Sequence, residues 1–166
     1  GADYFDYLGE MPSRYYTRGG FSASDKISGA TMTDTILSGV STCHACVIAC
    51  GRKVIIPNGE YKRSESKGPE YETIVGFGPN LEISDLPAIT HFGQLCDAYG
   101  MDTISLSNTI GLAHLMYAEG VITSADTDGI ELKWGETTHI ENLIRLTAHR
   151  EGFGELLALG ARALAK

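Results

Sequence analysis

Long apolar runs and an excess of positive charge are both missing from this 166-residue sequence. No stretch approaches the roughly 20 uninterrupted apolar residues that a membrane-spanning helix needs. The first residues also lack a basic region leading into an apolar one, which is the pattern of a secretory signal. With 13 Lys and Arg against 21 Asp and Glu, the formal charge is −8, which repels nucleic-acid phosphates. We therefore expect a cytoplasmic protein that binds neither membranes nor nucleic acids.

The composition is that of an ordinary globular domain. Apolar residues make up 43% and charged residues 20% of the chain, and the mean hydropathy is −0.05. A chain of this length is expected to bury one compact core. It starts without Met and stops on a helical pattern, so we interpret it as a piece of a longer protein.

Three of the four cysteines, Cys43, Cys46 and Cys50, fall within eight residues. Disulfides are a poor fit, because bridges at such short spacings are strained and no secretory signal is present. Thiolates spaced in this way on a turn or helix start are expected to converge on one side, which suits a soft metal or an iron–sulfur cluster. Zinc is equally compatible, with His44 or Cys96 as the fourth ligand. The spacing alone leaves zinc and iron–sulfur open.

The first half of the chain predicts little regular structure. Residues 1–25 are expected to form an irregular connector, because their aromatic, Gly and Pro residues follow no period. A short helix is predicted over 27–38. Strands are predicted over 53–56 and 73–75, and the turn residues 57–59 favour a hairpin.

Helical patterns dominate the second half. Ser84 or Asp85 is expected to cap a helix with Pro87 in its first turn, and Gly100 to end it. Three more helices are predicted from Asp102 or Thr103 to near Gly120, from Thr137 or Thr138 to Gly152, and from Phe153 to Leu164. Within these patterns the residues expected to be core or surface positions rather than metal ligands are Cys96, His91, His114, His139 and His149. The predicted fold is a mostly α domain over 26–166 with a small β-hairpin.

Four uncommon motifs follow one another in a fixed order. They are the cysteine triplet, Gly68-Pro69-Glu70-Tyr71-Glu72, Phe77-Gly78-Pro79-Asn80 and Asp97-Ala98-Tyr99-Gly100-Met101. In this order and spacing the chain resembles the tungsten-containing aldehyde ferredoxin oxidoreductase family. The resemblance runs from about Phe21 to near the end of the chain, but it corresponds only to the middle, cluster-bearing part of the longer family enzymes.

The resemblance implies an oxidoreductase that converts aldehydes to carboxylic acids. Electrons pass from tungsten, or molybdenum, held by two pterins to a [4Fe-4S] cluster and on to ferredoxin. Cys43, Cys46 and Cys50 match three cluster ligands, and the fourth belongs to a later domain of the family. The isolated chain is therefore expected to be inactive and to hold the cluster poorly or lose it, with the remaining domains of the enzyme as partners. A homodimer is compatible with the resemblance.

The resemblance also assigns cofactor contacts. Asp97, Gly100 and Met101 match a D-x-x-G-L motif that contacts the pterin, with Met in place of Leu. An ionised Asp97 would accept hydrogen bonds from the amine-bearing ring. Arg52 follows the cysteine triplet and would offset the cluster's negative charge or reach a pterin phosphate.

Glu70 and Glu72 are the candidate acid–base residues. They flank Tyr71 in a segment expected to be extended, so their side chains should share one face. The resemblance implies that one of them acts beside the metal, and we favour Glu72. Some family members bind an extra iron through a Glu-x-x-His pattern. This chain carries His91 and Gln94 there, so that site is not expected.

A second function is compatible with the cysteine triplet alone. A zinc ion held by these cysteines would make a non-enzymatic structural or interaction module.

Overall fold

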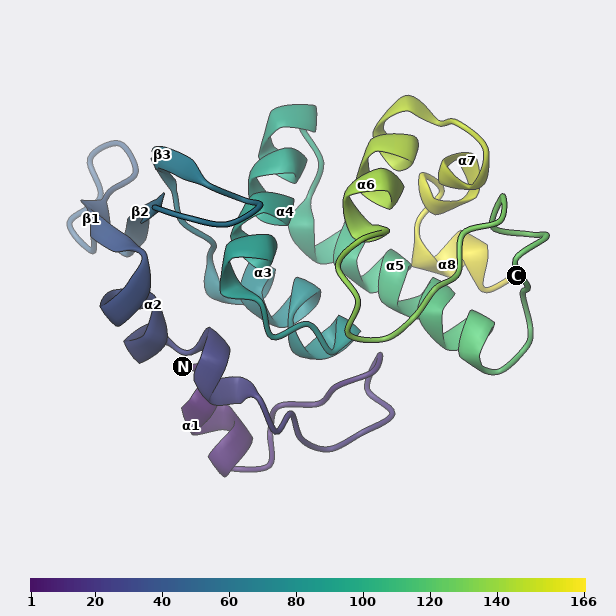
Figure 1. Cartoon of the computed structure of the whole chain (residues 1–166), viewed down its shortest axis with the longest axis horizontal. Helices are drawn as coiled ribbons and strands as arrows, with labels where there is room; N and C mark the ends of the chain where they lie inside the picture. Colours follow the sequence, from purple (N-terminus) through teal and green to yellow (C-terminus); the bar gives the residue numbers. More distant parts are fainter.

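The computed structural model describes residues 1–166, which form a helical body with a small sheet at one end of its long axis (Figure 1). The elements in chain order are α1 (Ala2–Tyr7), the 3-10 helix η1 (Ser24–Ile27), α2 (Gly29–Thr35), β1 (Leu37–Ser41), β2 (Gly51–Ile56), β3 (Arg63–Lys67), α3 (Tyr71–Phe77), the 3-10 helix η2 (Pro79–Leu81), α4 (Leu86–Tyr99), α5 (Thr103–Ala118), α6 (Ile140–His149), α7 (Phe153–Leu157) and α8 (Ala161–Leu164). The predicted mostly α class with a small β element is confirmed. None of the helices is long and apolar enough to cross a membrane.

The sheet is antiparallel and has the order β1-β2-β3. The predicted hairpin is present, with the turn at 57–59 following β2. Its partner strand is Arg63–Lys67, however, so the prediction that 73–75 completes the hairpin is wrong. Val54 and Ile56 of β2 point inward and are buried, whereas Lys53 and Ile55 point outward. The alternation fixes which face of the sheet lies against the helices.

The segment predicted as a second strand belongs to α3. Thr73, Ile74 and Val75 are β-branched and favour strands as isolated residues. In the structure Thr73, Ile74 and Phe77 are buried on one side of α3, which packs against α4 and α5. Burial of this helical face therefore outweighs the local strand preference.

The two longest helices form where their caps predict. Asp85 accepts a hydrogen bond from the Ala88 amide at 3.0 Å, and Gly100 ends α4 in the left-handed region at φ 70°. Asp102 caps α5 by accepting from the Ser105 amide at 2.7 Å. These interactions satisfy amides that a helix start otherwise leaves free.

Four boundaries differ from the predictions. The N-terminal connector contains α1, and the helix predicted over 27–38 is α2, capped by the Ser28 hydroxyl. The third predicted helix starts only at Ile140 and ends at His149. The single helix predicted over 153–164 is two short helices, because Gly160 adopts φ 84° between them. A left-handed residue cannot continue a right-handed helix.

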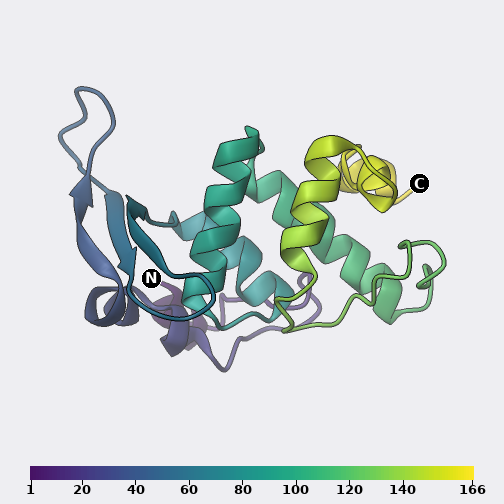
Figure 2. The same cartoon turned by 45° about the horizontal axis from the view of Figure 1, so that its top comes forward.

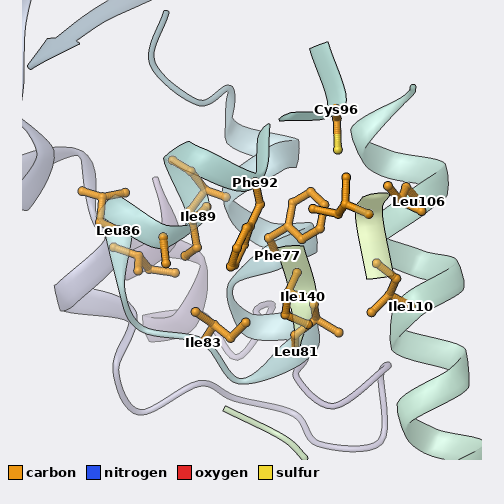
Figure 3. Packing of buried hydrophobic residues seen from close by; sticks show 14 of the residues in the cluster. Phe77, Leu81, Ile83, Leu86, Ile89, Phe92, Cys96, Leu106, Ile110 and Ile140 are labelled. Carbon is orange, nitrogen blue, oxygen red and sulfur yellow. The ribbon is translucent and has the colours of Figure 1, made fainter. Parts of the chain in front are cut away.

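The core lies where α3, α4, α5 and α6 meet (Figure 3). Phe77 of α3 and Phe92 of α4 are both 0% exposed, and their ring centroids are 5.8 Å apart. Cys96 of α4 is also 0% exposed and belongs to this cluster, as expected of a core residue. These packed helices form the body of the protein, and the sheet lies at one end of it (Figure 1).

Candidate functional site

The three clustered cysteines lie in the β1–β2 connection, residues 42–50, which we call the cysteine loop. Figure 2 shows it projecting beyond the sheet. Cys43, Cys46 and Cys50 are all exposed free thiols. The apolar side chains of Val47 and Ile48 are also exposed, at 94% and 73%. The tip of the loop therefore presents sulfur and apolar surface together.

Local hydrogen bonds shape the cysteine loop. The Thr42 hydroxyl donates to the Cys46 carbonyl, and the Cys46 amide donates to the Cys43 carbonyl at 3.1 Å. Ala45 and Ala49 adopt positive φ values of 56° and 50°. Each precedes a cysteine, and each left-handed residue that is not glycine costs about 1–2 kcal/mol. The loop thus carries backbone strain at two of its thiols.

The expected convergence of the three sulfurs is not present. No three Cys, His, Asp or Glu side chains are grouped so that they could hold a metal ion. The physical reason is that the loop has no packing partner within this chain, since its side chains are almost entirely exposed. The spacing supplies three donors but not the contacts that would fold them together.

Two neighbouring cavities lie near the base of the cysteine loop. One cavity of about 80 Å³ is lined only by polar residues, glycine and proline: Lys67, Gly68, Pro69, Glu70, Thr73, Thr90, Gly93, Gln94, Asp97 and Thr103. A neighbouring cavity of about 310 Å³ is more apolar: Cys50, Arg52 and Tyr71 line it together with Ala2, Ile27, Met32 and Ile74. Pro69 and Glu70 line both cavities. We call the two together the cleft; Cys50 lines one of its cavities and Asp97 the other.

Sheet pairing explains why Asp97 lies at this end. Lys53 of β2 is paired with Lys67 at the end of β3, next to the start of β2 where the cysteine loop returns. The Lys67 ammonium contacts the Asp97 carboxylate at 3.0 Å. Gly100 and Met101 line neither cavity: Gly100 turns the chain between α4 and α5, and Met101 packs against the core. Of the three motif residues, only Asp97 faces the cleft.

Glu70 and Glu72 do not share a face, so that expectation is wrong. Glu70 occupies the N-cap position of α3 in an extended conformation, whereas Glu72 lies in the first turn of the helix. Helical geometry turns Glu72 toward a separate cavity of about 40 Å³ that is also lined by Tyr16 and Asn108. Glu70 is therefore the glutamate that lies at the cleft.

Comparison with known proteins gives one family. The family model described as "Aldehyde ferredoxin oxidoreductase, domains 2 & 3" matches residues 1–166. The chain belongs to this family. A tungsten-containing aldehyde ferredoxin oxidoreductase of Pyrococcus horikoshii is 37% identical over 161 residues, which is 95% of this chain and 26% of that protein. The corresponding Pyrococcus furiosus protein is 35% identical over 159 residues.

Two further proteins are similar to this chain, one over a smaller part of the sequence and one in fold. A Pyrococcus furiosus protein named "Aliphatic sulfonate oxidoreductase, WOR-like subunit" is 34% identical over 117 residues, or 70% of this chain. The active-site complex BamBC of benzoyl coenzyme A reductase shares the fold, with a TM-score of 0.72 and 21% identity over 92% of this chain and 22% of that one. The chain spans about a quarter of the length of the aldehyde ferredoxin oxidoreductases it matches.

Cys96 cannot act as a fourth metal ligand beside the cysteines of the loop. Its thiol is enclosed in the core. Burial, together with the nearby carboxylates of Asp97 and Asp102, raises its pKa to about 12. A metal ligand must be the thiolate, so the alternative in which Cys96 completes a zinc site has no support in the structure.

The donor chemistry of the family member fits an iron–sulfur cluster and a pterin. Three free thiols in an exposed loop are soft donors without a competing disulfide. The hydroxyls of Thr73 and Thr103, 3.0 Å apart, and the Asp97 carboxylate offer acceptors for a ring with amine and amide donors. These are matches of donor type, since the three sulfurs are not grouped in the structure.

Sequence reasoning missed several residues that line the cleft. Lys67, Gln94 and Thr103 reach it from β3, α4 and α5. Lys67 immediately precedes the Gly68-Pro69-Glu70 motif, so adjacency was a usable signal. Gln94 and Thr103 lie just outside the Asp97–Met101 motif, but only the packing of the helices brings them to the same place.

Proposed function

We propose that this chain is the cluster-bearing part of an oxidoreductase that oxidises aldehydes to carboxylic acids and passes electrons to ferredoxin. Tungsten or molybdenum held by two pterins would supply the two-electron chemistry, and a [4Fe-4S] cluster would carry electrons away singly. The observation that supports this most is a pair of neighbouring cavities that share Pro69 and Glu70, one lined by Cys50 and the other by Asp97.

Three residues that line the cleft would have separate roles in this function. Asp97 would accept hydrogen bonds from the pterin ring. Arg52 lines the cleft beside Cys50 and donates to the Cys50 carbonyl, where its charge would offset that of a cluster. Glu70 lies between the two cavities, where a carboxylate can take up or release the proton that aldehyde oxidation requires.

Aldehydes are the proposed substrate class because the relatives named for them match 95% of this chain, against 70% for the sulfonate oxidoreductase. The fourth cluster ligand, the rest of the pterin site and the ferredoxin partner would come with the remaining domains. Residues 1–25 would act as a connector and residues 26–166 as the family domain.

The proposal predicts where activity resides. The 166-residue chain alone should purify without tungsten and should not oxidise aldehydes, because the fourth cluster ligand and the rest of the pterin site would be missing. An enzyme that joins this chain to its pterin-binding and C-terminal domains should reduce benzyl viologen when an aldehyde is added. Aldehyde-dependent viologen reduction by the isolated chain, or none by the joined enzyme, contradicts the proposal.

A further inference from the structure

Gln94 connects α4 to the end of β3 through three hydrogen bonds. Its amide nitrogen donates to the Ser66 hydroxyl at 2.9 Å and to the Lys67 carbonyl at 2.7 Å. Its amide oxygen accepts from the Arg63 guanidinium at 2.5 Å. Because a carbonyl oxygen only accepts, the contact with Lys67 fixes which way the amide points. The amide nitrogen and the amide oxygen of Gln94 therefore both make hydrogen bonds to residues of β3.

The segment that Gln94 contacts, residues 66–70, forms one wall of the cleft. On its other side the Gly68 amide donates to the Arg52 carbonyl at 2.8 Å. A Cβ atom at Gly68 would lie 2.8 Å from the Arg52 Cβ and 2.9 Å from a Val54 methyl, so the segment lies directly against β2. It is thus held from two sides, by β2 and by Gln94.

Gln94 and Asp97 are three residues apart on α4, so they lie on the same face of the helix. Gln94 fixes the backbone of Lys67, and the Lys67 ammonium contacts Asp97 at 3.0 Å. Glu70, three residues after Lys67, ends the same segment at the junction of the two cavities. The position of this wall therefore sets both the charge around Asp97 and the place of Glu70.

We propose that Gln94 is a positioning residue of the cleft. It holds residues 66–70 so that Lys67 partly neutralises Asp97, which suits the cleft to an uncharged ring bearing amine and amide donors rather than to a cation. The identity of that ring rests on the proposed function. The placement of residues 66–70 by Gln94 does not, because it depends only on hydrogen bonds within this chain.

The test uses Gln94→Met, which keeps the length of the side chain and removes all three hydrogen bonds. The matched control is His91→Gln. His91 is also on α4 and lies 3.2 Å from Arg63, but it makes no hydrogen bond to residues 66–70. Amide hydrogen exchange at Gly68 reports on the wall, and the amides of α5 report on the rest of the fold. Binding of 2-amino-4-oxopteridine to the 166-residue chain, followed by its fluorescence, reports on the cleft.

We expect Gln94→Met to accelerate Gly68 exchange at least about tenfold and to weaken pteridine binding measurably, since one lost hydrogen bond is worth up to about tenfold and the variant loses three. His91→Gln should change neither, and α5 exchange should be unchanged in both variants. Equal effects in both variants, or faster Gly68 exchange with unchanged pteridine binding, overturn the inference.

The same measurements distinguish failure of the proposed function from failure of the role proposed for Gln94. If the wild-type chain does not bind the pteridine, the pterin assignment loses its support. Gly68 exchange then decides the inference alone: acceleration in Gln94→Met but not in His91→Gln supports it, and unchanged exchange overturns it.

Discussion

Replacement of Glu70 by glutamine is expected to lower kcat of the assembled enzyme about 10²–10⁴-fold, the usual contribution of a positioned acid or base. Glutamine keeps the size and shape of glutamate but cannot exchange a proton. Glu70 lies at the junction of the two cavities of the cleft, within the segment that also carries Lys67. Aldehyde-dependent viologen reduction measures the loss.

The matched control is Glu72→Gln. Glu72 is two residues away and carries the same charge, but it lines a different cavity. Its replacement should change kcat by no more than a few-fold. The opposite result, with Glu72→Gln inactive and Glu70→Gln active, would assign the proton transfer to Glu72 and show that the cleft is not the reacting site.

Acid should destabilise the fold through His114, which is buried, and its partly buried neighbour His139. His114 of α5 is 1% exposed, and its Nδ1 lies 2.9 Å from the Ile110 carbonyl. Because a carbonyl cannot donate, this Nδ1 carries the proton and the neutral Nε2 must accept. It accepts from His139 Nε2 at 2.7 Å. The ring of His114 also packs against Trp134, with centroids 5.2 Å apart.

A second proton on His114 would break this pairing, because Nε2 could no longer accept from His139. Burial lowers the pKa of His114 from its usual 6.5 to about 4. Between these two pH values the unfolded chain binds a proton that the folded chain does not. The contribution of His114 to the free energy of unfolding is therefore fully present above pH 6.5 and falls as the pH drops toward 4. Below pH 4 about 3 kcal/mol has been lost. Burial lowers the pKa of His139 as well, which adds to the loss in the same direction.

Urea unfolding at several pH values between 4 and 7 measures this dependence, and Trp134, the chain's one tryptophan, supplies the fluorescence signal. In His114→Gln the chain should be less stable at pH 7, and the pH dependence should be flatter because only His139 still contributes. If the wild type and the variant lose stability in parallel between pH 6.5 and 4, the buried histidine is not the cause.

Local signals predicted the helices that support the cleft. Asp85, Gly100 and Asp102 each act through backbone groups a few residues away, so their sequence positions suffice to place the ends of α4 and α5. The separation of α7 from α8 was missed, although Gly160 lies at the break. Glycine permits a left-handed residue but does not require one.

Tertiary packing determined what the sequence could not show. Thr73 and Ile74 form a helix because α4 and α5 cover them, and this moves Glu72 away from Glu70. The strand paired with β2 depends on a register that brings Lys67 to Asp97, 30 residues later. The cysteine spacing identifies three donors, but nothing in this chain packs on the cysteine loop to bring the sulfurs together.

We propose that Cys43, Cys46 and Cys50 together hold an iron–sulfur cluster. The most direct measurement is anaerobic reconstitution of the 166-residue chain with iron, sulfide and a small thiol that can act as the fourth ligand, followed by metal analysis and visible absorption. We expect uptake of iron and sulfide in equal amounts, with thiolate-to-iron absorption. Both should be lost when any of the three cysteines is changed to serine and retained in Cys96→Ala. One zinc per chain without iron uptake, or iron uptake that survives loss of the three cysteines, would contradict it.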